Sequence, residues 1–165
     1  PRSKGDLAGY YVVYPLSEVE VTVTEENGHL VHYKSLQDAF DLAEDESTIR
    51  LFNNCPILAT NDTGKSFTLT LDEIGSGISS PANTVTGGQI YVGGKPGSAL
   101  TLQNVYFENA QVVVDKDGTL NAKDGLVMTK ATDGAVIVKN GGQFVLDGNA
   151  QIWDNNGTNV VIILI

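Results

Sequence analysis

One pattern recurs three times in the second half of the sequence, with a period of 22 to 24 residues. The copies are GQIYVGGKPGSALTLQNVYFEN, AQVVVDKDGTLNAKDGLVMTKAT and AVIVKNGGQFVLDGNAQIWDNN, each with three short apolar runs separated by Gly, Asp, Asn or Lys. One repeat of this size cannot bury its own apolar face, so repeats must stack on one another. The sequence therefore predicts an all-β fold, a right-handed parallel β-helix of about five coils.

The three apolar runs of each repeat predict three parallel sheets. Side chains alternate between the two faces of a strand, so inward positions are those where matched residues of every repeat are apolar. Glycines 97, 118 and 142 fall between the first and second sheets, where we expect positive φ at a sharp corner. The inward ladders are Ile90, Val112, Val136, Val160 and Val92, Val114, Val138, Ile162 in the first sheet; Leu100, Leu120, Phe144 and Leu102, Ala122, Leu146 in the second; and Val105, Leu126, Ala150 and Phe107, Met128, Ile152 in the third.

Residues 1–47 follow a different pattern and predict a cap on the coils formed by residues 48–165, all within a single domain. The segment VEVTVTEENGHLVHY alternates on both sides of Asn27-Gly28, a favoured hairpin turn. The segment SLQDAFDLAEDE predicts a short helix with Ser35 as its N-cap. Its apolar face, which would cover the first coil, consists of Leu36, Ala39, Phe40 and Ala43.

Composition narrows the classes of partner. The chain has 165 residues and a formal net charge of −10, which repels nucleic acid and disfavours anionic polysaccharides unless a cation bridges the two. No apolar run approaches the roughly 20 residues of a membrane span, so we expect no membrane insertion. Cys55 is the only cysteine, which excludes an intrachain disulfide, and we interpret it as a small buried apolar residue.

The run YKSLQDAFDLAEDESTIRLFNN, followed by FTLTLD, resembles the start of right-handed parallel β-helix (pectin lyase-like) modules in surface proteins of Gram-positive bacteria. The resemblance covers roughly residues 33–156 and rests on scaffold motifs. It implies a secreted or cell-wall-associated, extracellular location and a role in adhesion or glycan contact. The wider superfamily also contains polysaccharide lyases and glycoside hydrolases, so it leaves enzymatic and non-enzymatic functions open.

The sequence offers candidate metal ligands but no catalytic residues that we can assign. Asp115, Asp117 and Asp124 lie near two turns of one coil, where carboxylates and backbone carbonyls are suitable calcium ligands. Their spacing matches neither an EF-hand nor a calcium-binding β-roll, and Asp before Gly is also favourable turn chemistry. His29 and His32 are three residues apart on a predicted strand, so they point to opposite faces. Calcium is the one cofactor that the pattern admits.

Two apolar stripes are predicted on the outside of the coils, where polar side chains are usual. Such a stripe is covered by another segment such as YYVVY, by a partner chain or by a ligand. Aromatic rings along a solenoid also stack on sugars, which makes Tyr106, Trp153 and Tyr91 candidate glycan contacts. The stripes are Tyr91, Val113, Ile137 and Val161 on the first sheet, and Tyr106, Val127 and Trp153 on the third.

The sequence therefore favours a non-catalytic extracellular or cell-surface module that acts in adhesion or as a rigid scaffold, with glycan binding as a further role. Its expected partners are a glycan or a host or cell-surface protein. The alternative is a fragment or relative of a polysaccharide lyase or glycoside hydrolase. The final run NVVIILI alternates without a closing turn residue, so we expect either further coils or self-association through the C-terminal coil.

Overall fold

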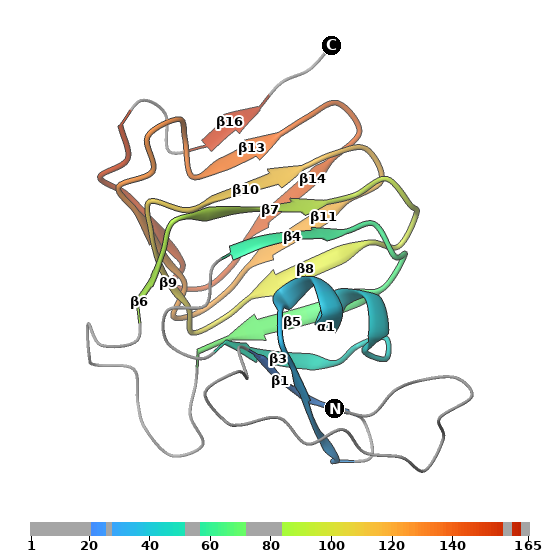
Figure 1. The fold of residues 1–165 in the computed structure, drawn as a ribbon. Coiled ribbons are helices and arrows are strands. Elements are labelled where there is room, and N and C mark those ends of the chain that lie inside the picture. The colour runs from blue at the N-terminus through green and yellow to red at the C-terminus, as the bar shows by residue number, and fades with distance from the viewer. Residues whose placement is uncertain (1–20, 26–27, 52–56, 72–83, 157–159, 163–165) are drawn as a thin grey trace.

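The described residues form an all-β solenoid with one short helix (Figure 1). The computed structural model describes residues 21–25, 28–51, 57–71, 84–156 and 160–162. Its elements are β1 (Val21–Thr24), β2 (Leu30–Tyr33), α1 (Leu36–Leu42), β3 (Thr48–Leu51), β4 (Ile57–Asn61), β5 (Ser66–Thr70), β6 (Thr84–Thr86), β7 (Gly88–Val92), β8 (Ala99–Leu102), β9 (Tyr106–Glu108), β10 (Gln111–Val114), β11 (Thr119–Ala122), β12 (Val127–Thr129), β13 (Val136–Val138), β14 (Gln143–Leu146), β15 (Gln151–Ile152) and β16 (Val160–Ile162).

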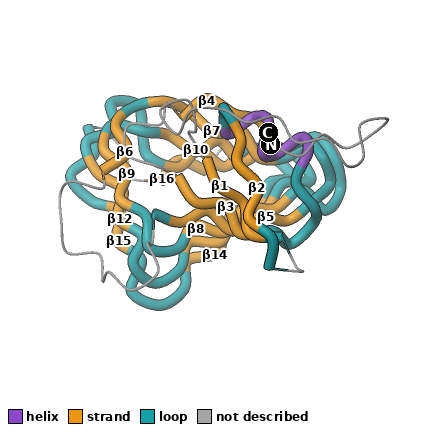
Figure 2. Tube along the Cα trace, turned by 60° about the horizontal axis from the view of Figure 1, so that its bottom comes forward, coloured by secondary structure: helices purple, strands orange, loops and turns teal. Residues whose placement is uncertain are grey.

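Three sheets surround the core, as the view in Figure 2 shows. Sheet 1 contains β4, β7, β10, β13 and β16; sheet 2 contains β3, β5, β8, β11 and β14, extended by β1 and β2; sheet 3 contains β6, β9, β12 and β15. A full turn needs one strand in each sheet. Because sheet 3 has four strands in the described residues, the solenoid has about four turns, and the expected five was one too many.

The predicted inward ladders of the central coils are confirmed. Val112 pairs in parallel register with Ile90 and Val136, and Leu120 pairs with Leu100 and Phe144. The inward residues of the second and third repeats in sheets 1 and 2 are almost fully buried, apart from those of β14. In that last strand of sheet 2 Phe144 is half-buried and Leu146 is 59% exposed, because no later strand of the described residues lies over them.

The corner between sheets 1 and 2 uses glycine for two different physical reasons. Gly97 adopts the expected positive φ of +92°. Gly118 and Gly142 do not, so that expectation was wrong for these two positions. Each instead lies against the preceding coil: a Cβ on Gly118 would stand 2.2 Å from the carbonyl oxygen of Val92, far closer than carbon and oxygen can approach.

The predicted hairpin and helix both form at the start of the solenoid. β1 pairs antiparallel with β2 and with β3, so the hairpin extends sheet 2 beyond the first coil. Ser35 caps α1 by accepting a hydrogen bond from the Asp38 backbone N–H at 3.1 Å. The expected boundary between residues 47 and 48 falls directly before β3. In the described part of the chain no helix has the length and apolarity to cross a membrane.

Helix α1 also covers the free edge of β4, the first strand of sheet 1 in the described residues. The Gln37 side chain donates to the Thr60 carbonyl at 3.1 Å, and its own oxygen accepts from the Thr60 N–H at 2.8 Å. One side-chain amide thereby replaces the next strand of the ladder at this position. An exposed strand edge is a template for pairing with other chains, so this contact protects the end of sheet 1.

The inward assignment predicts the effect of a buried charge. Val114→Asp places a carboxylate at a fully buried position, which we expect to cost about 3–5 kcal/mol of folding free energy. Val145→Asp is the matched control, because Val145 lies on the outer face of sheet 2 and is 47% exposed; we expect a change within about 0.5 kcal/mol. Urea denaturation followed by circular dichroism measures both, and equal stability of the two variants would contradict the assignment.

The cap contains a buried tyrosine that gives it a measurable pH dependence. Tyr33 is 4% exposed. Burial first, and then the charges of Glu25, Glu44 and Asp38, raise the pKa of Tyr33 from 10.0 to about 12. Below pH 10 the tyrosine is protonated in both states, so its full contribution to stability is present. Between pH 10 and 12 only the unfolded chain loses the proton, so folding stability falls.

Tyr33→Phe should therefore remove part of the alkaline loss of stability. Between pH 9 and 11 we expect the wild-type free energy of unfolding to fall by on the order of 1 kcal/mol more than that of the variant. Urea titrations at the two pH values give this difference directly. The remaining tyrosines and lysines titrate in both proteins and cancel. A parallel loss in both proteins would show that Tyr33 keeps an ordinary pKa.

Candidate functional site

The three aromatic candidates lie on two sheets. Tyr91 is on the outer face of sheet 1 and is 36% exposed, whereas Tyr106 is half-buried on sheet 3. Trp153 directly follows β15 and is 49% exposed. In the register of sheet 3, Tyr106 pairs with Val127 and Val127 with Gln151. The predicted stripe of Tyr106, Val127 and Trp153 was therefore wrong in its third member.

Trp153 occupies the edge of sheet 3 nearest to sheet 1. Its N–H donates to the Met128 carbonyl at 3.1 Å, which places it level with Thr129 and Glu108 of the two preceding coils. It is thus two coils and two residues away from Tyr106. The two rings lie on one side of the solenoid but not in one ladder.

On sheet 1 the predicted outer stripe is in register: Tyr91 pairs with Val113, which pairs with Ile137. Val113 is only 3% exposed although it points away from the core. The Lys139 ammonium lies 5.5 Å from the centre of the Tyr91 ring, so this side chain reaches across the coil that carries Val113. Lysine and tyrosine thereby cover part of the stripe. The segment YYVVY, residues 10–14, lies outside the described residues.

The three aspartates proposed as calcium ligands do not converge. Asp115 and Asp117 lie between β10 and β11, and Asp124 follows β11 at its other end. Asp115 accepts a hydrogen bond from Lys139 at 2.9 Å and another from the Lys116 N–H, and these bonds lower the pKa of Asp115. Asp117 adopts a positive φ of 64°. Within the described residues no three His, Cys, Asp or Glu side chains form a group able to hold a metal.

A second ion pair lies on the outside of sheet 3. Lys130 donates to Glu108 at 2.6 Å, and this hydrogen bond, aided by the Glu108 charge, raises the pKa of Lys130. The two residues belong to successive coils, because Glu108 pairs with Thr129, the residue before Lys130. The pair therefore links neighbouring coils across the surface.

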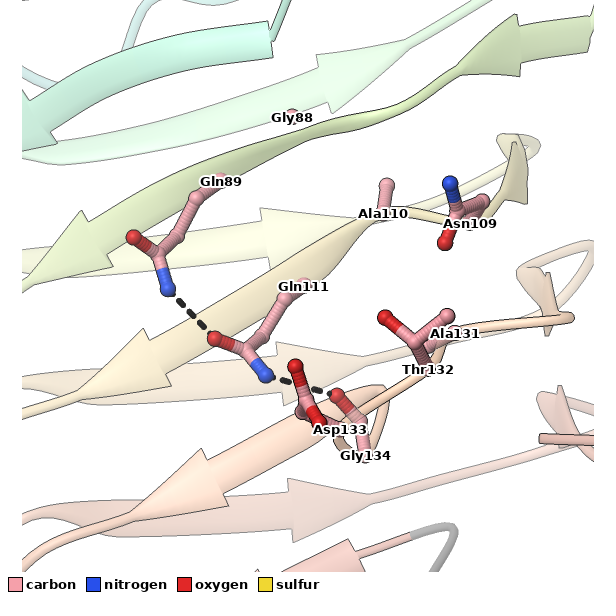
Figure 3. Close-up of a pocket in the computed structure, with 9 residues that line it drawn as sticks. All are labelled: Gly88, Gln89, Asn109, Ala110, Gln111, Ala131, Thr132, Asp133 and Gly134. Carbon is pink, nitrogen blue, oxygen red and sulfur yellow. Dashed lines mark hydrogen bonds between the residues drawn. The ribbon is translucent and has the colours of Figure 1, made fainter. Parts of the chain in front are cut away.

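The sequence interpretation missed a polar hollow at the corner between sheets 3 and 1, here called the corner hollow. Its volume is about 180 Å³. Figure 3 shows its lining from three successive coils. The sequence contains one signal for this hollow. The connections from the third strand of one repeat to the first strand of the next differ in length. The lining residues are Gly88, Gln89, Asn109, Ala110, Gln111, Ala131, Thr132, Asp133 and Gly134.

The remaining candidates have structural surroundings or lie outside the described residues. His32 Nδ1 lies 2.9 Å from the Thr22 hydroxyl oxygen across the β1–β2 hairpin. His29 precedes β2 in the same hairpin. Cys55 lies outside the described residues.

Comparison of the chain with protein-family models, with curated proteins and with the solved structures finds no match. Function must therefore be inferred from the residues and geometry described above.

Proposed function

We propose that this chain is a non-catalytic β-solenoid module that serves as a rigid scaffold in adhesion outside the cell and contacts glycans through its side. The observation that carries the proposal is the use of its lateral charged groups. Lys130 pairs with Glu108 and Lys139 with Asp115, and each pair joins two successive coils. Such links connect neighbouring coils across the surface, as a rigid scaffold requires.

The shape of the molecule supports the same proposal. Parallel hydrogen-bond ladders run along the solenoid on three sides of one apolar core. Bending the solenoid would therefore break hydrogen bonds and core contacts together. A stack of this kind holds the side chains on its outside at fixed positions. That property suits a spacer or an adhesion module.

The extracellular or cell-wall location and the relation to pectin lyase-like modules of Gram-positive bacteria are parts of this proposal. They rest on the likeness of residues 33–54 and 67–72 to the start of such modules. Glycan contact rests on the exposed ring of Trp153 and on Tyr106, which lie on the same side of the solenoid. A host or cell-surface protein is the other partner that an adhesion module would meet.

Trp153 provides the test of glycan contact. A glycan array identifies a bound oligosaccharide, and Trp153→Ala should then weaken its binding by roughly 1–3 kcal/mol because stacking is lost. Trp153→Phe keeps an aromatic face and should retain most of the affinity. Val145→Ala, on the outer face of sheet 2, is the control for loss of an exposed apolar side chain elsewhere.

The array and a reducing-end assay together separate the possible functions. Unchanged binding by Trp153→Ala would exclude the tryptophan as a contact. Release of reducing or unsaturated ends from plant or mucin polysaccharides would contradict a non-catalytic module and favour the lyase or hydrolase alternative.

The last coil generates a separate proposal, self-association through the C-terminal coil. Leu146 occupies an inward position of β14 and is 59% exposed, so apolar surface is accessible at this end of the solenoid. We expect light scattering to show a mass that rises with concentration in the micromolar range, and Leu146→Lys to reduce the association. A concentration-independent monomer would refute this proposal.

A further inference from the structure

The corner hollow follows from unequal connections between sheet 3 and sheet 1. Only Gly87 separates β6 from β7, and only Asn109 and Ala110 separate β9 from β10. Between β12 and β13 the connection is residues 130–135. The first two corners therefore turn tightly, whereas the third is a longer loop. The hollow lies between this loop and Gly88, two coils away, and spans three coils (Figure 3).

A relay of side-chain amides fixes the floor of the hollow. Gln89 and Gln111 occupy the same register position on β7 and β10. The Gln89 amide donates to the Gln111 side-chain oxygen, and the Gln111 amide donates to the Gly134 carbonyl at 2.9 Å (Figure 3). Each primary amide has two donors and an oxygen with two lone pairs, so both retain hydrogen-bonding capacity after these bonds. The relay therefore orients the remaining groups before any ligand arrives.

The rim adds three further polar side chains. Asn109, Thr132 and Asp133 are exposed and line the hollow. Together with the glutamines they provide amide and hydroxyl groups, which can both donate and accept hydrogen bonds, and one carboxylate, which accepts them. The hydroxyl groups of a sugar are likewise both donors and acceptors. Such a set suits a ligand that is rich in hydroxyl groups.

Charge narrows the ligand class. The lining contains one carboxylate, Asp133, and no cationic side chain. The nearby Lys130 is paired with Glu108, and the chain as a whole carries a net charge of −10. An anionic ligand would be repelled both locally and by the average field. Acidic sugars are therefore disfavoured relative to neutral ones.

Size limits the ligand to a small unit. At about 30 Å³ for each water molecule, a hollow of about 180 Å³ has room for about six waters, the scale of one sugar ring. Its lining is mostly polar, whereas pockets for drug-sized ligands are larger and mainly apolar. We propose that the corner hollow binds one residue of a neutral glycan, with Gln89, Gln111, Thr132 and Asp133 as the hydrogen-bonding groups. This inference rests on the proposed glycan-binding function and gives it a ligand class and a second contact besides Trp153.

The test uses side-chain amide signals as a local probe. A ¹⁵N-labelled full chain is titrated with the hexaoses of cellulose, mannan and xylan, and with hexagalacturonate as the acidic comparison. We expect one or more neutral hexaoses to shift the side-chain amide resonances of Gln89 and Gln111, and hexagalacturonate to leave them in place. Thr132→Val removes the hydroxyl and Asp133→Asn removes the charge, both with little change in volume. Each should weaken binding about tenfold.

Asp62→Asn is the matched control, because Asp62 is an exposed aspartate between β4 and β5, at a different corner. It should bind as the wild type does. Thermal melting of every variant establishes that the fold is kept; if Thr132→Val destabilises the chain, Asp133→Asn and the amide shifts still decide the outcome.

The possible results separate this inference from the proposed function. If a glycan binds and Trp153→Ala weakens it, while the two hollow variants bind normally and the amide signals do not move, the corner hollow is excluded and the glycan-binding function stands. Amide shifts without any effect of Trp153→Ala would support the hollow and exclude the tryptophan. No binding of any tested glycan, neutral or acidic, would overturn both.

Discussion

The structure depends on the parallel hydrogen-bond ladder between successive coils. The backbone of β10 is bonded on both sides: the Val112 N–H donates to Ala135 of the following coil, and the Asp115 N–H donates to Val92 of the preceding one, both at 2.8 Å. A coil that lacks one neighbour leaves half of its backbone groups without partners, which is costly away from water. No repeat is therefore stable alone, and stability belongs to the stack.

Once the ladder sets the register, the side chains that matter for function lie in fixed columns, in which the residues of successive coils are about 4.8 Å apart. Columns of apolar side chains form the core, as with Ile90, Val112 and Val136. Two pairs of opposite charge on successive coils link the coils at the surface. A column of glutamines becomes a relay where Gln111 stands between Gln89 and Gly134. The corner hollow arises where the connection between β12 and β13 is longer than the two connections that precede it, so the regular stack also positions the irregular site.

The sequence was sufficient for the three sheets, the helix and the inward ladders of the central coils, because repeated apolar runs determine which residues must stack. It was applied wrongly at the outer stripe of sheet 3. Trp153 was expected beside Tyr106 and Val127, yet Val127 pairs with Gln151, which leaves the tryptophan two residues further along. The expected inward ladder of Phe107, Met128 and Ile152 already has this register, so the sequence contained the information that the stripe overlooked.

Other features depend on contacts that a single strand pattern does not contain. The glycine at 118 is required by the nearby Val92 carbonyl and not by its own φ, and the corner hollow forms only when three connections of unequal length are stacked. The edge protection by Gln37 likewise joins residues 23 positions apart. Such features depend on contacts between particular atoms of neighbouring segments. The sequence period predicts which residues stack but not these individual contacts.

Native-state amide hydrogen exchange tests the central claim most directly. If the ladder makes the stack one cooperative unit, the amides of Val112, Asp115, Lys123 and Val127 should exchange only through global unfolding. Their opening free energies should then be equal and should match the free energy of unfolding measured with urea. Rapid exchange of these amides, or widely different opening free energies among them, would contradict a cooperative parallel stack.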